Sequence, residues 1–456
     1  MELNFKKMAE KYYATALNTL TKNIKIDSVY DATTVSKEAP YGKGVKKCFD
    51  FIKQLAISDG FLVDMCDGRC IEISTGAGAR LVGVFGHQDV VPISGSWKYP
   101  PFSAEIEDNI MYGRGTSDDK GPIISAYYAL KLLKDHDLIN NYRVKLVMGG
   151  DEERGSSCLE YYFKTLKKEQ PTYGFTPDGD FPLIYGEKGI MNYKYEGSIH
   201  FPDIISIEAG VVANSVIDKA KVVVKDPLKL DIYLKNHPEI EYKKINENSF
   251  VFYGQAAHGS TPEKGVNAGV IVLESIGKAY DISFFKIISE EYKDYNGRNL
   301  EQFYESENLG KTTYNVGLIS YDGIKFSMTV NFRYPETVNG EKVIEEIQRI
   351  SPLPIYILSK SEYLYFDPEN TPFIKALYDV YVEETGDRVN KPLTIGGGTY
   401  AKEVENTVAF GSCFPSRNDH IHEANEKIHL EDFYNSIAIY AHAIYKLGTL
   451  EDESNL

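Results

Sequence analysis

The sequence predicts an α/β protein in which a central mixed sheet flanked by helices forms the main domain and an α+β segment is inserted into it. The first observation is a set of apolar runs that end in polar, glycine-rich stretches, as buried strands do when loops follow them. The second is the segment 121–137, whose apolar residues have helical spacing. Strands that alternate with helices favour a sheet covered on both faces, with the chemistry in the loops at the strand ends. The apolar runs are ARLVGVFGHQDVVP (79–92), NYRVKLVMGGDEERGS (141–156) and PTYGFTPDGDFP (171–182).

The middle of the chain has a different pattern, which is the third observation. Strand-like and helical segments mix there, and Asp322-Gly323 predicts a hairpin turn. Helical spacing returns at 432–447 and closes the fold. We therefore expect two domains, one made of residues 1–189 and 365–456 and an inserted one of residues 190–364. The strand-like segments are 219–225, 249–258 and 313–335, and the helical ones are 266–280 and 340–350.

The composition excludes several classes of protein. With 43% hydrophobic residues among 456, the chain has enough apolar material for large cores. Its 50 basic and 66 acidic residues give a formal net charge of −16, which repels phosphate backbones. Nucleic acid and membrane are therefore not expected partners, and no apolar run approaches the ~18 residues of a membrane span. An odd number of cysteines without paired spacing indicates no disulfide framework, so we expect a cytoplasmic protein.

Histidines and carboxylates recur where the apolar runs end. His87 and Asp89 are two residues apart, so they project from the same side of an extended segment. A carboxylate in that position is able to accept the second ring N–H of a metal-bound imidazole. Glu152 and Glu153 follow a buried strand directly, where clustered acids cost free energy unless a cation compensates them.

Other candidates have ordinary structural explanations when each is taken alone. Asp118 and Asp119 are adjacent and fit a turn or a helix N-cap. Asp178 lies beside Pro177 and Gly179 and fits a turn. His422 lacks the second histidine of an HExxH zinc motif.

Together these residues predict an oxygen- and imidazole-rich site for two divalent ions. Mixed histidine and carboxylate ligands suit Zn²⁺, Mn²⁺ or Co²⁺ better than thiolate-preferring metals. Other site chemistries lack their motifs, because the chain has no GxSxG elbow, no Walker A loop and no GxGxxG sequence.

Several motifs occur in an order and spacing that resemble a known family. They are GHQDVVP, YGRGTSDDKGP, GGDEERGS, GFTPDGDFPLI and HEANE, between about residues 79 and 426. The chain resembles the co-catalytic dinuclear metallopeptidases that include carboxypeptidase G, aminoacylase and carnosinase. The segments GQAAHGSTPEKGVNA, VNFRYP and GGGTYAK narrow the resemblance to the bacterial PepV-type, Xaa-His dipeptidase-like enzymes. This resemblance implies a zinc-peptidase-like catalytic domain and an inserted lid of ferredoxin-like character.

The resemblance also implies roles for the metal-site residues. His87 and Asp178 would bind one metal, Glu153 and His422 the other, and Asp118 would bridge them, with Asp119 as the competing bridge. The peptide bond after the bridging residue is typically cis in such proteins. Asp89 would orient His87, and Glu152 would be the general base acting on a metal-bridging hydroxide. Zn²⁺ is the favoured metal, with Mn²⁺ or Co²⁺ as alternatives.

For the inserted domain, the resemblance implies substrate contacts. His258 would contact the oxyanion, Arg333 would receive the C-terminal carboxylate, and Gly396, Gly397 and Gly398 would cradle the same carboxylate. Asn214 is a weaker candidate, because Ile217 replaces a proline that the family usually has. Without the resemblance, His258 is explained as a surface histidine in a turn and Arg333 as an ordinary strand arginine. The three glycines are then explained as a tight turn.

The favoured function is a metal-dependent dipeptidase that reads both ends of a small peptide substrate. One alternative is an N-acyl amino acid deacylase, similar to succinyl-diaminopimelate desuccinylase, which shares the metal motifs. A third is a metal-containing binding protein without activity, which the intact set of ligand types disfavours. In relatives with a short lid, the lid histidine comes from a partner subunit. Two halves of a lid as long as this one could replace such a pair within one chain, so a monomer is favoured and a homodimer is the alternative.

Overall fold

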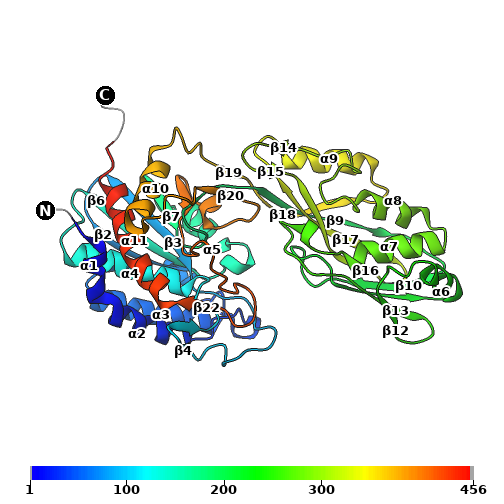
Figure 1. Ribbon diagram of the computed structural model, residues 1–456, viewed down its shortest axis with the longest axis horizontal. Helices are drawn as coiled ribbons and strands as arrows, with labels where there is room; N and C mark the ends of the chain where they lie inside the picture. Colours follow the sequence, from blue (N-terminus) through cyan, green and yellow to red (C-terminus); the bar gives the residue numbers. More distant parts are fainter. Residues whose placement is uncertain (1–2, 452–456) are drawn as a thin grey trace. The chain divides into compact units, whose positions relative to one another are not determined.

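The computed structural model describes residues 3–451, which form two compact units (Figure 1). The first unit contains the described residues up to Tyr185, then Phe366–Leu393, and those from Thr399 onward. The second unit contains Gly186–Tyr365 and Thr394–Gly398. Each unit has its own hydrophobic core.

The short glycine-rich segment Thr394–Gly398 belongs to the second unit, whereas the sequence predicts it within the larger domain, residues 365–456. Two hydrogen bonds explain this membership. The backbone N–H of Lys188 donates to the carbonyl of Ile395 at 3.1 Å, and the Thr394 hydroxyl donates to the carbonyl of Asn308 at 2.8 Å.

A mixed sheet with the strand order β1-β2-β6-β3-β7-β21-β8-β19 runs through the first unit, and β20 pairs with β8. Strand β19 and parts of β8 and β20 belong to the second unit. Strand β3 runs parallel to β6 and β7, and β7 runs parallel to β21, whereas β2 is antiparallel to β6. Strand β3 is buried along almost its whole length, as its apolar sequence requires. The bounds are β1 (Leu62–Asp64), β2 (Cys70–Gly76), β3 (Arg80–His87), β6 (Tyr142–Gly149), β7 (Tyr173–Thr176), β8 (Ile184–Glu187), β19 (Leu364–Tyr365), β20 (Leu393–Ile395) and β21 (Thr407–Ala409).

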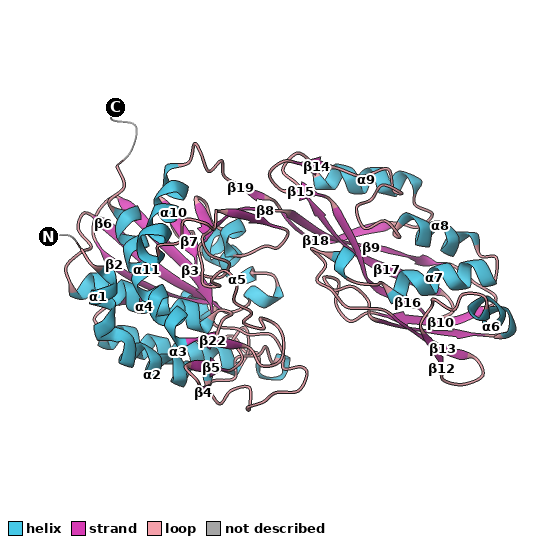
Figure 2. Cartoon of the chain, in the orientation of Figure 1, coloured by secondary structure: helices cyan, strands magenta, loops and turns pink. Residues whose placement is uncertain are grey.

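Helices cover this sheet, as Figure 2 shows in cyan against the magenta strands. Helices α4 and α11 pack against each other and against β3 and β6, and they match the predicted helical segments 121–137 and 432–447. A small separate sheet has the order β22-β5-β4. The bounds are α1 (Phe5–Ala9), α2 (Tyr13–Ile24), α3 (Lys43–Ser58), α4 (Lys120–Asp135), α5 (Ser157–Glu160), α10 (Pro372–Thr385), α11 (Leu430–Gly448), β4 (Glu105–Glu107), β5 (Ile110–Tyr112) and β22 (Lys427–His429).

The second unit is built on an antiparallel sheet with the order β12-β13-β11-β10-β16-β17-β9-β18. The predicted hairpin at Asp322-Gly323 is present between β16 and β17. Asn339 caps α9, because its side chain accepts a hydrogen bond from the N–H of Lys342 at 3.1 Å. The bounds are β9 (Gly189–Ser198), β10 (Ile204–Ala209), β11 (Lys219–Val224), β12 (Tyr242–Lys244), β13 (Ser249–Tyr253), β16 (Thr313–Tyr321), β17 (Lys325–Tyr334), β18 (Ile355–Ser361), the small pair β14 (Glu305–Ser306) and β15 (Gly310–Lys311), α6 (Leu228–Lys235), α7 (Ala268–Ala279), α8 (Ser283–Glu291) and α9 (Gly340–Ile350).

The architecture confirms the predicted fold class, a central mixed sheet flanked by helices together with an α+β unit. Among residues 3–451, no helix is both long and apolar enough to cross a membrane.

Candidate metal centre

Three neighbouring strands of the first unit bring three of the five predicted ligands to one edge of the sheet. His87 is the last residue of β3 and lies opposite Gly149, the last residue of the parallel strand β6. Glu153 follows β6, and Asp178 follows β7, which also runs parallel to β3. Because the carboxyl ends of parallel strands meet at the same edge, residues distant in the sequence become neighbours there.

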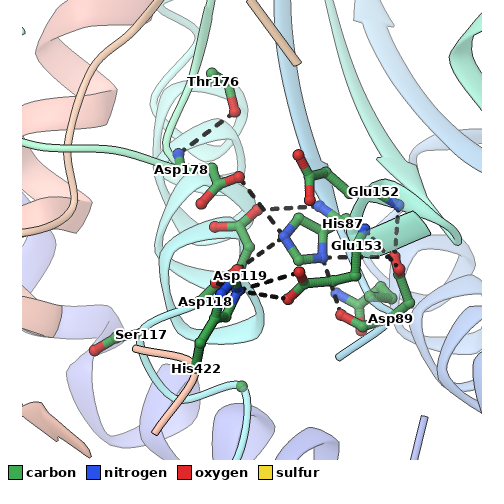
Figure 3. A network of polar contacts seen from close by, with 12 residues as sticks. His87, Asp89, Ser117, Asp118, Asp119, Glu152, Glu153, Thr176, Asp178 and His422 are labelled. Atoms are coloured by element: carbon green, nitrogen blue, oxygen red, sulfur yellow. Dashed lines mark hydrogen bonds and ion pairs between the residues drawn. The ribbon is translucent and has the colours of Figure 1, made fainter. Parts of the chain in front are cut away.

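Asp118 lies between the two histidines (Figure 3). Its Oδ1 is 3.0 Å from Nε2 of His87, and its Oδ2 is 2.9 Å from Nε2 of His422. On one side, Asp178 Oδ2 is 3.6 Å from the same nitrogen of His87. On the other side, Glu153 Oε2 is 3.1 Å from Nε2 of His422. The structure therefore brings together all five residues that the sequence analysis named as ligands.

The adjacent acids Asp118 and Asp119 have different surroundings. The peptide bond between them is cis, as the resemblance implied. Asp119 is fully buried, and its Oδ2 accepts a hydrogen bond from the backbone N–H of His87 at 3.0 Å. Burial and the neighbouring Asp178 raise the pKa of Asp119 well above its usual value. Asp118, in contrast, contacts both imidazole rings.

Asp89 contacts both His87 and the acidic loop, but with different atoms. Nδ1 of His87 donates to the backbone carbonyl of Asp89 at 2.9 Å, while the carboxylate Oδ1 of Asp89 is 3.5 Å from that nitrogen. The carboxylate instead accepts hydrogen bonds from the backbone N–H groups of Glu152 and Glu153, each at 3.2 Å. The resemblance implies that Asp89 orients the imidazole, and its main-chain oxygen makes the shorter contact.

Asp151, the first of the three consecutive acids, is held by the protein itself. Its Oδ1 accepts a hydrogen bond from the N–H of Cys158 at 2.9 Å, and its Oδ2 accepts one from the hydroxyl of Ser157. Both carboxylate oxygens of Asp151 thus have partners within the protein, and these partners could not be identified from local sequence.

The electrostatics of the cluster show an excess of buried negative charge. Burial raises the pKa of Glu152 well above its usual value. Burial and the charge of Asp118 raise the pKa of Glu153 to about 7. Burial alone would lower the pKa of His422, but its hydrogen bonds with Asp118 and Glu153 raise that pKa to about 11. A bound cation would compensate these carboxylates in place of the protons.

The donor set fits divalent metal ions. Two groups of ligand atoms each lie within 4.8 Å of one another, one from His87, Asp118 and Glu153 and the other from His87, Glu152 and Asp178. Nε2 of His87 is buried and makes no hydrogen bond, although Asp118 is near, so its lone pair is available to a metal. Imidazole nitrogen with carboxylate oxygen suits zinc, manganese or cobalt.

The predicted substrate-binding residues all lie in the second unit, whereas the residues of the metal cluster all lie in the first unit. Arg333 is buried on β17, where its Nε donates to Asn331 Oδ1 at 2.9 Å and its Nη1 donates to the carbonyl of Gly396. Burial lowers the pKa of Arg333 to about 10. Gly397 and Gly398 follow Gly396 in the segment Thr394–Gly398.

His258 and Asn214 are also neighbours in the second unit. The N–H of Gly259 donates to the carbonyl of Asn214 at 2.7 Å, and Ser215 forms a β-bridge with His258. Nδ1 of His258 lies 2.6 Å from the hydroxyl oxygen of Ser260. The structure therefore places these two sequence-predicted residues on paired segments.

Comparisons with known proteins agree with this architecture. The family described as "Peptidase family M20/M25/M40" matches residues 83–446. The "Putative dipeptidase SH1171" of Staphylococcus haemolyticus is 34% identical over 473 aligned positions, which cover 97% of this chain and 99% of that protein. The "Putative dipeptidase YtjP" of Bacillus subtilis is 33% identical over 453 positions, covering 93% of this chain and 95% of the relative.

Solved structures share the fold at low sequence identity. An M20 family metallo-carboxypeptidase from Sulfolobus solfataricus has a TM-score of 0.61 and 17% identity, covering 95% of this chain and 99% of that one. Human carnosine dipeptidase 1 has a TM-score of 0.59 and 14% identity, covering 98% of each chain. The extent of the family match and of the two relatives shows that the chain belongs to the M20 family of metal-dependent peptidases.

Proposed function

We propose that the protein is a dipeptidase that uses two divalent metal ions to hydrolyse dipeptides with a free N-terminus. The observation that carries this proposal is the position of Asp118, whose two carboxylate oxygens each face one imidazole, 3.0 Å from His87 and 2.9 Å from His422. A carboxylate whose two oxygens each face a nitrogen donor is placed to bridge a pair of ions of the kind that two-metal hydrolases use.

In this proposal, His87 and Asp178 would hold one ion, Glu153 and His422 would hold the other, and Asp118 would serve both. Zn²⁺ is the favoured ion, and Mn²⁺ or Co²⁺ are the alternatives that the same donors accept. When bound, such ions lower the pKa of a water and polarise the carbonyl of the scissile bond.

Glu152 is the proposed general base. It takes the proton of the attacking water and then returns it to the leaving amine. Burial raises the pKa of its carboxyl group, which makes the carboxylate a stronger proton acceptor than an exposed glutamate. The hydrogen bond from its backbone N–H to Asp89 restrains the segment that carries this side chain.

The second unit supplies the proposed substrate contacts. Arg333 would bind the C-terminal carboxylate, since it is a buried cation and no carboxylate pairs with it among residues 3–451. The N–H groups of Gly396, Gly397 and Gly398 would add donors to the same carboxylate. His258 would donate to the oxyanion that forms at the scissile carbonyl. Asn214, on the segment paired with that of His258, would make a substrate contact.

The experiment that tests this function is a substrate panel after metal removal and add-back. We expect the protein to be inactive after a chelator has removed its metal. Adding Zn²⁺, Mn²⁺ or Co²⁺ should restore its hydrolysis of free dipeptides. N-acetylated dipeptides, tripeptides and dipeptide amides are the matched controls, since each changes one end of the substrate. Faster cleavage of N-acyl amino acids than of any dipeptide would replace the proposal with a deacylase, and no turnover with any metal would overturn it.

A further inference from the structure

We propose that Glu426 is a positioning residue that holds Asp118 in its metal-binding place, an inference that rests on the proposed metal centre. Glu426 is fully buried. Its Oε1 accepts hydrogen bonds from three backbone N–H groups of one loop, those of Gly115 at 3.0 Å, Ser117 at 3.0 Å and Asp118 at 3.2 Å. The last of these belongs to the residue whose side chain faces both imidazoles.

The backbone around Glu426 locks it to the same loop. The N–H of Gly113 donates to the carbonyl of Glu426 at 2.9 Å, and the hydroxyl of Ser117 donates to the carbonyl of Lys427 at 2.8 Å. Strand β22, which begins at Lys427, pairs with β5, which ends at Tyr112 just before the loop. Residues 113–118 therefore curl around the Glu426 carboxylate, between strand β5, which pairs with β22, and helix α4.

Glu426 also connects two ligand segments, because it follows His422 by four residues. The Glu426 carboxylate thus fixes the backbone of Asp118. The segment that contains Glu426 also carries His422, whose Nε2 is 2.9 Å from Asp118 Oδ2. A shift of Glu426 would move both partners of this contact. Groups behind the direct ligands orient them in this way in many metal sites.

The charge of Glu426 has one dedicated partner. Nη1 of Arg114 donates to its Oε2 at 2.6 Å, and both side chains are fully buried. The guanidinium of Arg114 lies over the ring of Trp97, 5.2 Å from the ring centroid. A glutamine at position 426 would keep one oxygen for the loop but would turn an NH₂ group toward the buried guanidinium, which leaves that cation uncompensated.

The test compares metal binding by the full-length wild type, Glu426→Gln and Glu426→Asp, with Mn²⁺ as the probe. Calorimetric titration of the metal-free proteins, prepared with a chelator that is then removed, gives their affinity for Mn²⁺. The electron paramagnetic resonance spectrum of bound Mn²⁺ reports the geometry of its ligands. Asp59→Asn is the matched control, because Asp59 accepts from Tyr127 at 2.6 Å and pairs with Lys131 at 3.1 Å in the same unit, away from the ligand loops. We expect Glu426→Gln to lose roughly 10- to 100-fold in Mn²⁺ affinity and to alter the spectrum, and Asp59→Asn to bind as the wild type does.

Glu426→Asp keeps the charge but shortens the side chain by one methylene. We expect the shorter carboxylate to keep its ion pair with Arg114 and to lose some of the three hydrogen bonds from the loop. We expect an intermediate loss of affinity from it, and it carries the test if Glu426→Gln does not fold. Wild-type affinity and spectrum in the folded Glu426 variants, or an equal loss in Asp59→Asn, would overturn the inference. Because metal binding is the readout, a wild type that binds Mn²⁺ but cleaves no dipeptide would refute the proposed function and leave this comparison intact.

Discussion

The carboxylate of Asp89 accepts a hydrogen bond from the backbone N–H of Glu152, with 3.2 Å between Asp89 Oδ1 and that nitrogen. The other carboxylate oxygen accepts from the N–H of Glu153 at the same distance. The imidazole of His87 makes its shorter contact with the Asp89 carbonyl oxygen, at 2.9 Å. The Asp89 side chain is therefore placed to align the proposed base more than to align the histidine.

This division of contacts makes a prediction for Asp89→Asn. The backbone carbonyl that orients His87 remains, so we expect the variant to keep both metal ions. The new NH₂ group cannot accept a hydrogen bond, so one of the two backbone N–H groups of Glu152 and Glu153 loses its acceptor. We expect the loop that carries Glu152 to shift and kcat to fall roughly 10- to 100-fold. Metal content by mass spectrometry and dipeptide kinetics check this. If Asp89→Asn loses metal in proportion to activity, the carboxylate acts mainly on His87.

Glu152→Gln tests the proposed base directly. The substitution conserves shape but cannot accept a proton, so we expect kcat to fall by about 10²- to 10⁴-fold while KM and metal content change little. Glu152→Asp, which retains a carboxyl group, should recover part of the rate. The measurement is steady-state kinetics on one dipeptide across pH with metal content determined in parallel. Wild-type turnover in Glu152→Gln would remove this residue from the reaction.

Much of the fold and the metal cluster follows from local patterns. Helices α4 and α11 are recognisable because their apolar residues repeat at helical spacing. The convergence of His87, Glu153 and Asp178 is predictable because they end or follow strands that turned out to be parallel neighbours. Charged residues at the ends of buried strands were the signal in each case.

Other features depend on contacts between distant segments and have no local signal. Asp118 and Asp119 are the same residue type at adjacent positions, so only their tertiary partners distinguish their roles. The glycine-rich segment 394–398 pairs with Lys188 and Asn308, which no composition pattern indicates. Glu426 stood within the HEANE motif, but its function depends on a loop more than 300 positions earlier in the chain.

Arg333 leads to a prediction about substrate ends. Its guanidinium is held by the side chain of Asn331 through Nε and by the carbonyl of Gly396 through Nη1. We propose that its remaining N–H groups bind the C-terminal carboxylate of the substrate. We expect Arg333→Ala to raise KM and lower kcat for free dipeptides, because this binding energy positions the scissile bond. The matched substrate is the same dipeptide as its C-terminal amide, for which wild type and variant should differ much less. An equal penalty on acid and amide would show that Arg333 does not read the carboxylate.

A pH-dependent stability is predicted for the buried Lys145. Its ammonium lies over the rings of Phe85, Tyr162 and Phe163, at 5.8, 5.1 and 5.4 Å from their centroids. Burial lowers the pKa of Lys145 to about 8 in the folded protein. The unfolded lysine keeps its proton up to a pKa of about 10.4, so between these values the unfolded state binds more protons than the folded state. Raising the pH through this window therefore stabilises the fold.

Lys145→Met removes this titration and isolates its effect from that of the other groups. From pH 8 to pH 10, we expect the free energy of unfolding of the wild type to rise by roughly 2 kcal/mol relative to the variant. Trp97 is the single tryptophan of the chain and lies in the same unit as Lys145, so its fluorescence during denaturant unfolding reports the relevant transition. Parallel pH profiles for the two proteins would contradict the prediction, because they would require Lys145 to keep its proton throughout the window.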